Sequence, residues 1–255
     1  MRHTLFSTLF LLIGFTIHQG ALATPNTQLE PVVMLMQDSQ PKYFLPEDPR
    51  KGLCVEIYQE LIERLSNQAI EASITPTYLP IKRVLRGVEL NSSHIFCGAG
   101  RNAKREKRFI YSETAVYHVS NVVASHDSSA YEIESFDSIS NQQLVVGALF
   151  GTSSATFVKK HQGVQVNDSF LDLKTGLNAV ANKRVELFYY HDLGLNFLIK
   201  DWDLPLKVVP HKFRTVPQWI IYSKSIHPTT HEKIENALKA MEQEGFLKEV
   251  WSRYF

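Results

Sequence analysis

Basic residues cluster directly after a short apolar run in this sequence, and such a cluster can bind an anion. They include Arg101, Lys104, Arg105 and Arg108. On charge alone, a solvated surface or a nucleic-acid-binding patch is the more common meaning of such a cluster. The glycines at 98 and 100 favour a ligand site instead, because glycine lets backbone N–H groups approach a bound molecule closely.

The element that must position this cluster is the apolar run from His94 to Cys97, which predicts a short buried strand. In open α/β sheets, ligands bind beyond the carboxyl ends of the strands. The basic residues follow that end of the predicted strand, so we expect them to lie beside a ligand.

Familiar catalytic motifs do not occur in the chain. It has no Gly-x-Ser-x-Gly elbow, no His-Glu-x-x-His pair and no phosphate-binding glycine loop. Its ten histidines lack the spacing of metal ligands, and we interpret His94, His118 and His191 as isolated polar or packed residues. We therefore expect neither a metal ion nor a cofactor.

Cys54 and Cys97 are the only two cysteines. In an exported protein, two cysteines more often form a disulfide than a metal site or a nucleophile. Cys54 would open a helix and Cys97 would end a neighbouring strand, which favours proximity and hence a disulfide. Two buried free thiols are the alternative.

Residues 1–23 have the pattern of a cleaved secretory signal peptide. A basic start at Arg2 and His3 precedes an apolar core, and the small residues Ala21 and Ala23 precede Thr24. The apolar core is too short to favour a membrane span, although a retained anchor is the rival interpretation. We expect the working protein to begin near Thr24 and to lie in the periplasm.

The expected mature chain has no net charge. Removing Arg2 from the 27 basic residues leaves 26, against 26 acidic residues. General nucleic-acid binding needs a surplus of Lys and Arg, so we expect no nucleic-acid partner. About 232 residues remain, enough for one large domain or two small ones, and we expect a monomer.

From Pro31 the chain alternates between strand-like and helix-like segments, which predicts an α/β fold with a mainly parallel sheet. The first unit is expected to have strands at 32–36, 74–79 and 95–97 and helices at 55–65 and 81–89. The helix at 55–65 has an apolar stripe and a charged outer face.

After an extended segment at 116–125, polar residues to 140 are typical of a surface excursion that starts a second lobe. The alternation then restarts, with strands at 144–149 and 185–190, a helix opening at 151–154 and another at 171–181. An extended segment at 216–223 leads into a helical tail at 230–255. Two similar lobes joined by extended segments suggest a hinge with a cleft.

Several short motifs, each weak alone, occur in a specific order and spacing. They are Pro41-Lys-Tyr-Phe44 with Gly52 and Glu56, Lys104-Arg105 with Tyr111-Ser112, Gly147 with Gly151-Thr-Ser153, Arg184-Val-Glu186, and a tail from Asn236-Ala-Leu238 through Glu244-Gly-Phe-Leu247 to Trp251. In these motifs nearly the whole mature chain resembles extracellular solute-binding protein family 3, the polar-amino-acid type of periplasmic binding protein.

The resemblance implies a two-lobed type II periplasmic-binding-protein fold, in which two hinge strands join lobes made of mainly parallel sheets flanked by helices. It places lobe 1 at residues 24–117 and 221–255 and lobe 2 at residues 118–220. It implies capture of a small carboxylate-bearing or amino-acid-like solute in the cleft. The expected partner is an ABC transporter permease or a membrane receptor.

The resemblance also implies how the ligand carboxylate is held. Arg105 would bind it through two parallel hydrogen bonds, and a surface ion pair is the alternative role for this side chain. Thr152 and Ser153 would offer hydroxyl and backbone N–H groups at a helix start, where plain helix capping is the alternative. Gly98 and Gly100 would contribute through their backbone.

Two further positions are candidates for ligand contact. Tyr43 and Phe44 follow the first strand and would cover the apolar part of the ligand or a cationic group, with core packing as the alternative. Arg83 follows Leu79-Pro-Ile81, where many relatives have a tryptophan two residues before the arginine.

The largest departure from the family pattern is at His191 and Asp192. Amino-acid binders of the family usually have an acidic residue at the end of this strand, where it receives the ammonium group of the ligand. Either Asp192 does so after a one-residue shift, or His191 replaces the carboxylate, which disfavours an ammonium group and makes binding pH-sensitive.

Binding without catalysis is the leading hypothesis, and two alternatives remain. Some relatives on this scaffold are periplasmic dehydratases of the cyclohexadienyl type, which need a general acid such as Glu113, His191 or Asp192 in the cleft. The other alternative is a sensory module that presents its ligand to a membrane receptor.

Overall fold

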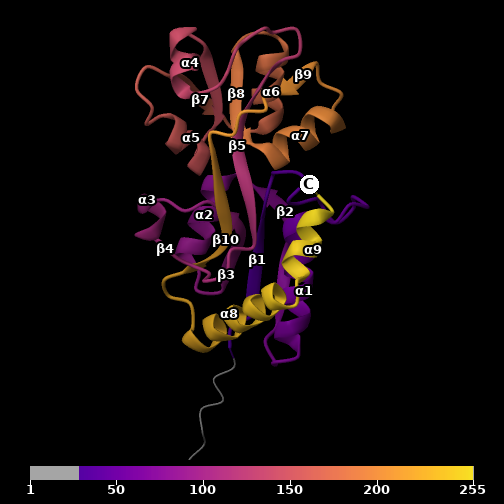
Figure 1. The fold of residues 1–255 in the computed structure, drawn as a ribbon. Helices are drawn as coiled ribbons and strands as arrows, with labels where there is room; N and C mark the ends of the chain where they lie inside the picture. The colour runs from indigo at the N-terminus through magenta and orange to yellow at the C-terminus, as the bar shows by residue number, and fades with distance from the viewer. Residues whose placement is uncertain (1–28, 255) are drawn as a thin grey trace, which may run out of the picture.

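The computed structural model describes residues 29–254, so the expected signal peptide at 1–23 lies outside the described residues. The described chain forms two lobes joined by two long strands, β5 (Tyr117–His126) and β10 (Arg214–Ser223) (Figure 1). Lobe 1 contains the first and the last elements of the chain, and lobe 2 contains the elements between β5 and β10. The exact lobe boundaries drawn from the sequence stay a prediction.

Lobe 1 is built on a mixed sheet. Strands β2, β1 and β3 run parallel in that order, and β10 continues the sheet antiparallel to β3 and to β4. Its own strands are β1 (Val32–Gln37), β2 (Ala72–Leu79), β3 (His94–Ala99) and β4 (Phe109–Tyr111). Its helices are α1 (Leu53–Ser66), α2 (Ile81–Leu90), α3 (Ala103–Glu106), α8 (Pro228–Gln243) and α9 (Phe246–Ser252).

Lobe 2 repeats this plan. Strands β7, β6 and β8 run parallel, and β5 is antiparallel to both β8 and β9. Its own strands are β6 (Val145–Leu149), β7 (Gln165–Phe170), β8 (Leu187–His191) and β9 (Leu206–Val208). Its helices are α4 (Phe136–Asn141), α5 (Ser153–Val158), α6 (Leu173–Ala181) and α7 (Asp192–Asp201).

Helix α1 illustrates how the apolar stripe seen in the sequence builds the core of lobe 1. Its fully buried residues recur at the spacing of one helix face, at Leu53, Ile57, Leu61 and Leu65. On the same face, the Tyr58 hydroxyl donates a hydrogen bond to the Leu35 carbonyl at 3.1 Å. Helices α8 and α9 lie along α1 and complete the lobe (Figure 1).

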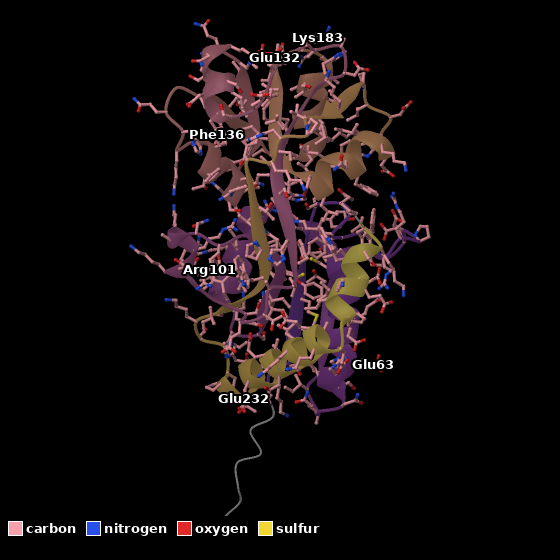
Figure 2. The ribbon with its side chains drawn as sticks, in the orientation of Figure 1. Glu63, Arg101, Glu132, Phe136, Lys183 and Glu232 are labelled. Carbon is pink, nitrogen blue, oxygen red and sulfur yellow. The ribbon has the colours of Figure 1, made fainter. Side chains whose placement is uncertain are left out.

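The core of lobe 2 contains a group of aromatic rings. Phe136, labelled in Figure 2, packs against the rings of His161, Tyr189 and Phe213. Phe213 immediately precedes β10, so this group ties the returning chain to the interior of lobe 2.

The expected disulfide is wrong for this structure, because Cys54 and Cys97 are both free thiols and both fully buried. The thiol of Cys54 donates to the hydroxyl of Tyr117 at 3.7 Å. Burial raises the pKa of Cys97, whereas the neighbouring Cys97 thiol and Lys42 outweigh burial and lower the pKa of Cys54. The sequence correctly suggested that the two residues share one region of the core.

The structure corrects several expected elements. The helical tail is two helices, because Gly245 adopts a left-handed backbone with φ of 81° between α8 and α9. Strand β7 and helix α7 were not predicted; β7 is polar and half exposed, and α7 starts directly after β8 without a turn sequence. No helix within residues 29–254 is both long enough and apolar enough to cross a membrane.

Candidate functional site

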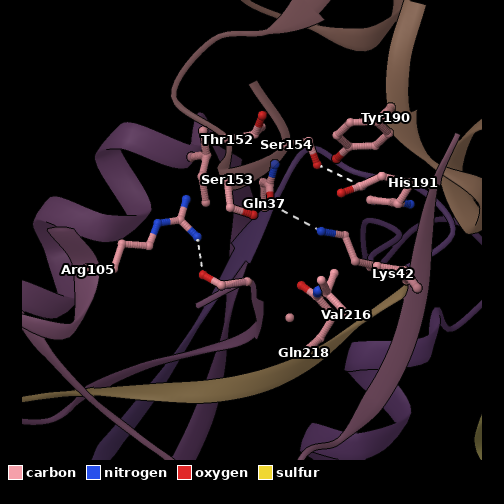
Figure 3. Close-up of a pocket in the computed structure, with 15 residues that line it drawn as sticks. Gln37, Lys42, Arg105, Thr152, Ser153, Ser154, Tyr190, His191, Val216 and Gln218 are labelled. Atoms are coloured by element: carbon pink, nitrogen blue, oxygen red, sulfur yellow. Dashed lines mark hydrogen bonds between the residues drawn. The ribbon is translucent and has the colours of Figure 1, made fainter. Parts of the chain in front are cut away.

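A small cavity lies where the two lobes meet, and its volume is about 40 Å³. Figure 3 shows side chains from both lobes converging on it. Six residues singled out in the sequence line the cavity: Gly98, Gly100, Arg105, Thr152, Ser153 and His191. The structure therefore brings together chemistry that is spread over more than ninety positions of the chain.

Arg105 belongs to the short helix α3, and its side chain turns inward from the surface. Asn102 caps this helix by accepting a hydrogen bond from the backbone N–H of Arg105 at 3.0 Å, which fixes the start of the turn. The guanidinium donates to the Gly100 carbonyl at 2.9 Å and to the Gly151 carbonyl of lobe 2 at 3.3 Å. Burial lowers the pKa of this guanidinium, and only 6% of the residue is exposed.

The other basic residues of this segment point away from the cavity. Arg101, labelled on lobe 1 in Figure 2, pairs with Glu106 at 2.7 Å on the surface. Arg108 pairs with Glu89 at 2.6 Å, and Lys104 is exposed. Of the cluster, Arg105 is the member that the fold buries at the cavity.

Lys42 is a second buried cation on the cavity, and sequence reasoning missed its role. Its ammonium donates to the Gln37 side-chain oxygen at 3.3 Å. The pKa of Lys42 is lowered to about 8; burial is the main cause, Arg105 adds to the lowering, and the thiols of Cys54 and Cys97 oppose it.

The local backbone explains why a lysine is held in this unusual place. The loop after β1 folds back onto the start of α1, where Cys54 N–H donates to the Lys42 carbonyl at 2.9 Å and Leu53 N–H donates to the Pro41 carbonyl at 3.0 Å. Gly52 allows this contact, since a Cβ on it would lie 2.8 Å from the Lys42 carbonyl oxygen. These bonds satisfy the free amides of α1 and fix Lys42 beside the cavity.

His191 faces the cavity as a neutral ring. Its Nδ1 accepts a hydrogen bond from Gly194 N–H at 2.9 Å, so the ring proton is on Nε2. The Nε2 atom is buried and has no partner among the described residues. Burial and the positive charge of Lys42 lower the pKa of His191 well below its ordinary value.

Asp192 is buried but lies outside the cavity lining. One carboxylate oxygen, Oδ1, accepts hydrogen bonds from the backbone N–H groups of Ser120 at 3.0 Å and Leu193 at 2.8 Å. The carboxylate thus holds β5 against the start of α7. Of the two candidates for receiving an ammonium group, the structure therefore places His191 at the cavity.

Thr152 and Ser153 stand at the start of α5. The Thr152 hydroxyl caps the helix, accepting from Ala155 N–H at 3.1 Å and donating to the Leu149 carbonyl at 2.8 Å. A Cβ on Gly100 would lie 2.3 Å from the Ser153 hydroxyl oxygen, so glycine at 100 lets the two lobes approach each other here.

Besides Asp192, three of the predicted contact residues lie away from the cavity lining. Tyr43 is fully buried in lobe 1 and donates from its hydroxyl to the Cys97 carbonyl at 2.5 Å. Phe44 packs edge-on against Phe197 of lobe 2, with ring centroids 5.7 Å apart. Arg83 lies exposed on α2.

Most of the remaining lining residues could not be singled out from the sequence. The polar ones besides Lys42 are Gln37, Asn121, Ser154, Tyr190 and Gln218, and the apolar ones are Ile81, Val119 and Val216. Many of them come from β5, β8 and β10, where an inward-facing side chain looks like any other strand residue. For Lys42, the one local signal in the sequence was its position in a family motif directly after β1.

Contacts across the cleft hold the lobes together around the cavity. The hydroxyls of Ser39 and Tyr190 share a hydrogen bond of 3.0 Å, and Arg50 pairs with Asp201 at 2.7 Å. The Arg50 guanidinium also lies 5.5 Å from the ring centre of Phe197 in α7 of lobe 2. Described residues of both lobes therefore meet on more than one side of the site.

No protein-family model and no curated protein matches the chain, whereas many solved structures share its fold. Holo ArgBP from T. maritima superposes with a TM-score of 0.71 at 16% identity, covering 87% of this chain and 95% of that one. An ancestral arginine-binding protein bound to arginine gives 0.74 at 18% identity, covering 88% and 97%.

A third similar structure is an ancestral amino acid-binding protein described as a precursor of cyclohexadienyl dehydratase. Its TM-score is 0.73 at 17% identity, and the match covers 88% of this chain and 95% of that one. These likenesses confirm the fold expected from the sequence, a two-lobed α/β fold of the type II periplasmic-binding-protein kind.

Proposed function

We propose that the protein is a periplasmic solute-binding protein that captures a small carboxylate-bearing or amino-acid-like solute between its lobes for an ABC transporter. The observation that carries the proposal is the Arg105 guanidinium, buried at the inter-lobe cavity with no carboxylate partner among residues 29–254. A buried cation without a counter-ion is costly, and a bound carboxylate offsets that cost.

The geometry suits capture by closure of the lobes. Arg105 belongs to lobe 1 and already reaches the Gly151 carbonyl of lobe 2 at 3.3 Å. A solute held by Arg105 on one side and by residues of α5 and β8 on the other would favour the closed arrangement over an open one. Binding and closure would then be one event, which a membrane partner can recognise.

The test is a thermal-shift screen of the mature protein against amino acids, other carboxylates and amines. A true solute raises the melting temperature by mass action. Arg105→Ala removes two charge-assisted hydrogen bonds, worth about 1.5–3 kcal/mol each, and should weaken binding at least about a hundredfold. Lys104→Met, an exposed neighbour on α3, is the matched control and should leave binding unchanged.

Silence across the whole panel would count against solute capture. Unchanged affinity in the Arg105→Ala protein would refute the role assigned to this side chain. Circular dichroism of the variant checks that its fold is retained.

A second candidate is a periplasmic dehydratase of the cyclohexadienyl type. The observation that favours it is His191, because among Glu113, His191 and Asp192 it alone lines the cavity. In its protonated, imidazolium form this ring would be the proton donor to a leaving group. Turnover of prephenate or arogenate by the purified protein, lost in His191→Ala, would support this function, and binding without turnover would exclude it.

A further inference from the structure

The charges around the cavity are strongly one-sided. Lys42 and Arg105 are 4% and 6% exposed, and neither forms an ion pair with any carboxylate among residues 29–254. No Asp or Glu of the described chain lines the cavity, and Asp192 binds the backbone of β5 and α7 instead. A solute must therefore bring the negative charge itself.

The two cations stand on different sides of the space. Figure 3 shows Arg105 and Lys42 reaching into the cavity from opposite sides, with Ser153 and Gln37 between them. Because the two cations approach from opposite sides, two carboxylates on a short chain can each pair with one of them. Each cation would then gain a charge-assisted hydrogen bond.

His191 supplies a third polar group on the cavity, a neutral donor that needs an acceptor. It is 7% exposed, and its Nε2–H is a buried donor without an acceptor among the described residues. A buried donor is normally paired, so an acceptor on the solute is the missing partner. The neutral imidazole cannot pair with an ammonium group as a carboxylate would, and the charges of Lys42 and Arg105 repel an ammonium group.

The wall between the polar groups is apolar. Ile81, Val119 and Val216 line it, and they suit a short carbon chain better than an inorganic anion. The cavity volume of about 40 Å³ limits this chain to a few atoms.

We infer that the solute is a short organic dicarboxylate without an ammonium group, with one carboxylate bound by Arg105 and the other by Lys42 and His191. This inference rests on the proposed solute-binding function. It narrows that function by excluding α-amino acids as the preferred ligands.

The test compares ligands of equal length on the wild-type protein by isothermal titration calorimetry. Succinate, butyrate and aspartate share a four-carbon chain and differ by one carboxylate or one ammonium group; oxalate and malonate test shorter chains. We expect the best dicarboxylate to bind at least tenfold more tightly than butyrate, and aspartate at least tenfold more weakly than succinate. Inorganic sulfate and phosphate should not compete.

The variant Lys42→Met removes the second cation and nearly keeps the side-chain volume. It should weaken dicarboxylate binding at least tenfold and leave butyrate within about threefold, whereas Lys104→Met should change neither. Because the ligand comparison uses the wild-type protein, it stands even if the Lys42 variant fails to fold.

The outcomes distinguish failure of the dicarboxylate inference from failure of the proposed solute-binding function. If an amino acid binds in an Arg105-dependent way and no dicarboxylate does, the inference is overturned and solute capture stands. Equal affinities for succinate and aspartate, or competition by sulfate alone, also overturn it. If no carboxylate or amino acid binds, both the inference and the proposed function fail.

Discussion

Replacing Lys42 by methionine should make the unliganded protein more stable, although it removes a hydrogen bond. The ammonium of Lys42 is buried, its charge interacts with the thiols of Cys54 and Cys97, and Arg105 faces it from the opposite side of the cavity (Figure 3). Its pKa falls from 10.5 to about 8 because burial penalises the charged form. Methionine fills nearly the same space without a charge, so the penalty disappears.

The size of the effect follows from this shift in pKa. One pKa unit corresponds to about 1.4 kcal/mol, so protonated Lys42 costs the folded state about 3 kcal/mol at pH 7. Loss of the hydrogen bond to Gln37 destabilises the variant by about 1 kcal/mol, so its net gain in the free energy of unfolding is about 2 kcal/mol.

The gain should depend on pH in a defined direction. Below pH 8 both the folded and the unfolded chain carry the proton, and the folded state bears the full penalty. Between about pH 8 and 10.5 the folded protein releases the proton first, so the penalty shrinks to about 2 kcal/mol at pH 9 and under about 1 kcal/mol at pH 10. The advantage of Lys42→Met should therefore fade as the pH rises.

The assay is urea unfolding of wild type, Lys42→Met and the exposed control Lys104→Met at pH 7, 9 and 10, without added carboxylates. The control should track wild type at every pH. If Lys42→Met is less stable than wild type at pH 7, or its difference from wild type is the same at all three values, then Lys42 is not a destabilising buried cation and the charge argument fails.

Two further predictions concern the closure of the lobes and the thiols. Gly100→Ala should keep the fold but weaken binding of the solute at least tenfold by calorimetry, because the added Cβ would lie 2.3 Å from the Ser153 hydroxyl oxygen across the cleft. The double variant Gly100→Ala with Ser153→Ala should recover part of the lost affinity. Unchanged affinity in the single variant would contradict the close approach of the two lobes. Cys54 and Cys97 should resist iodoacetamide in the native protein, because both thiols are buried. After unfolding without reductant both should be alkylated, which mass spectrometry can measure. An unmodified mass after unfolding would show that the two cysteines form a disulfide.

The sequence supported the α/β alternation, most strands and the larger helices, because these depend on local periodicity. The apolar stripe of α1 and the run that forms β3 are visible in any short window of the chain. Strand β7 was missed because four of its six residues are polar, with only Val166 and Phe170 apolar, and α7 was missed because it begins without a turn after β8. Local patterns carry little signal in such segments.

The sequence also indicated an anion site near Gly98 and Arg105 and a departure at His191. Charge alone could not tell which member of the basic cluster is buried, since Arg101, Lys104 and Arg105 look alike within one short segment, and it was the resemblance to the family that singled out Arg105. Only the tertiary structure turns Arg105 inward and leaves its neighbours to the solvent.

Lys42 shows the same limit most clearly. A lysine is normally exposed, so its type and position predict a surface residue. Its burial depends on the backbone contact between the loop and α1 and on the approach of lobe 2, which join residues far apart in the chain. The sequence by itself determined most of the elements and pointed to one cation of the site. Tertiary packing alone decided that two cations and a neutral histidine face the same cavity without a carboxylate, because burial and charge balance are properties of the assembled fold.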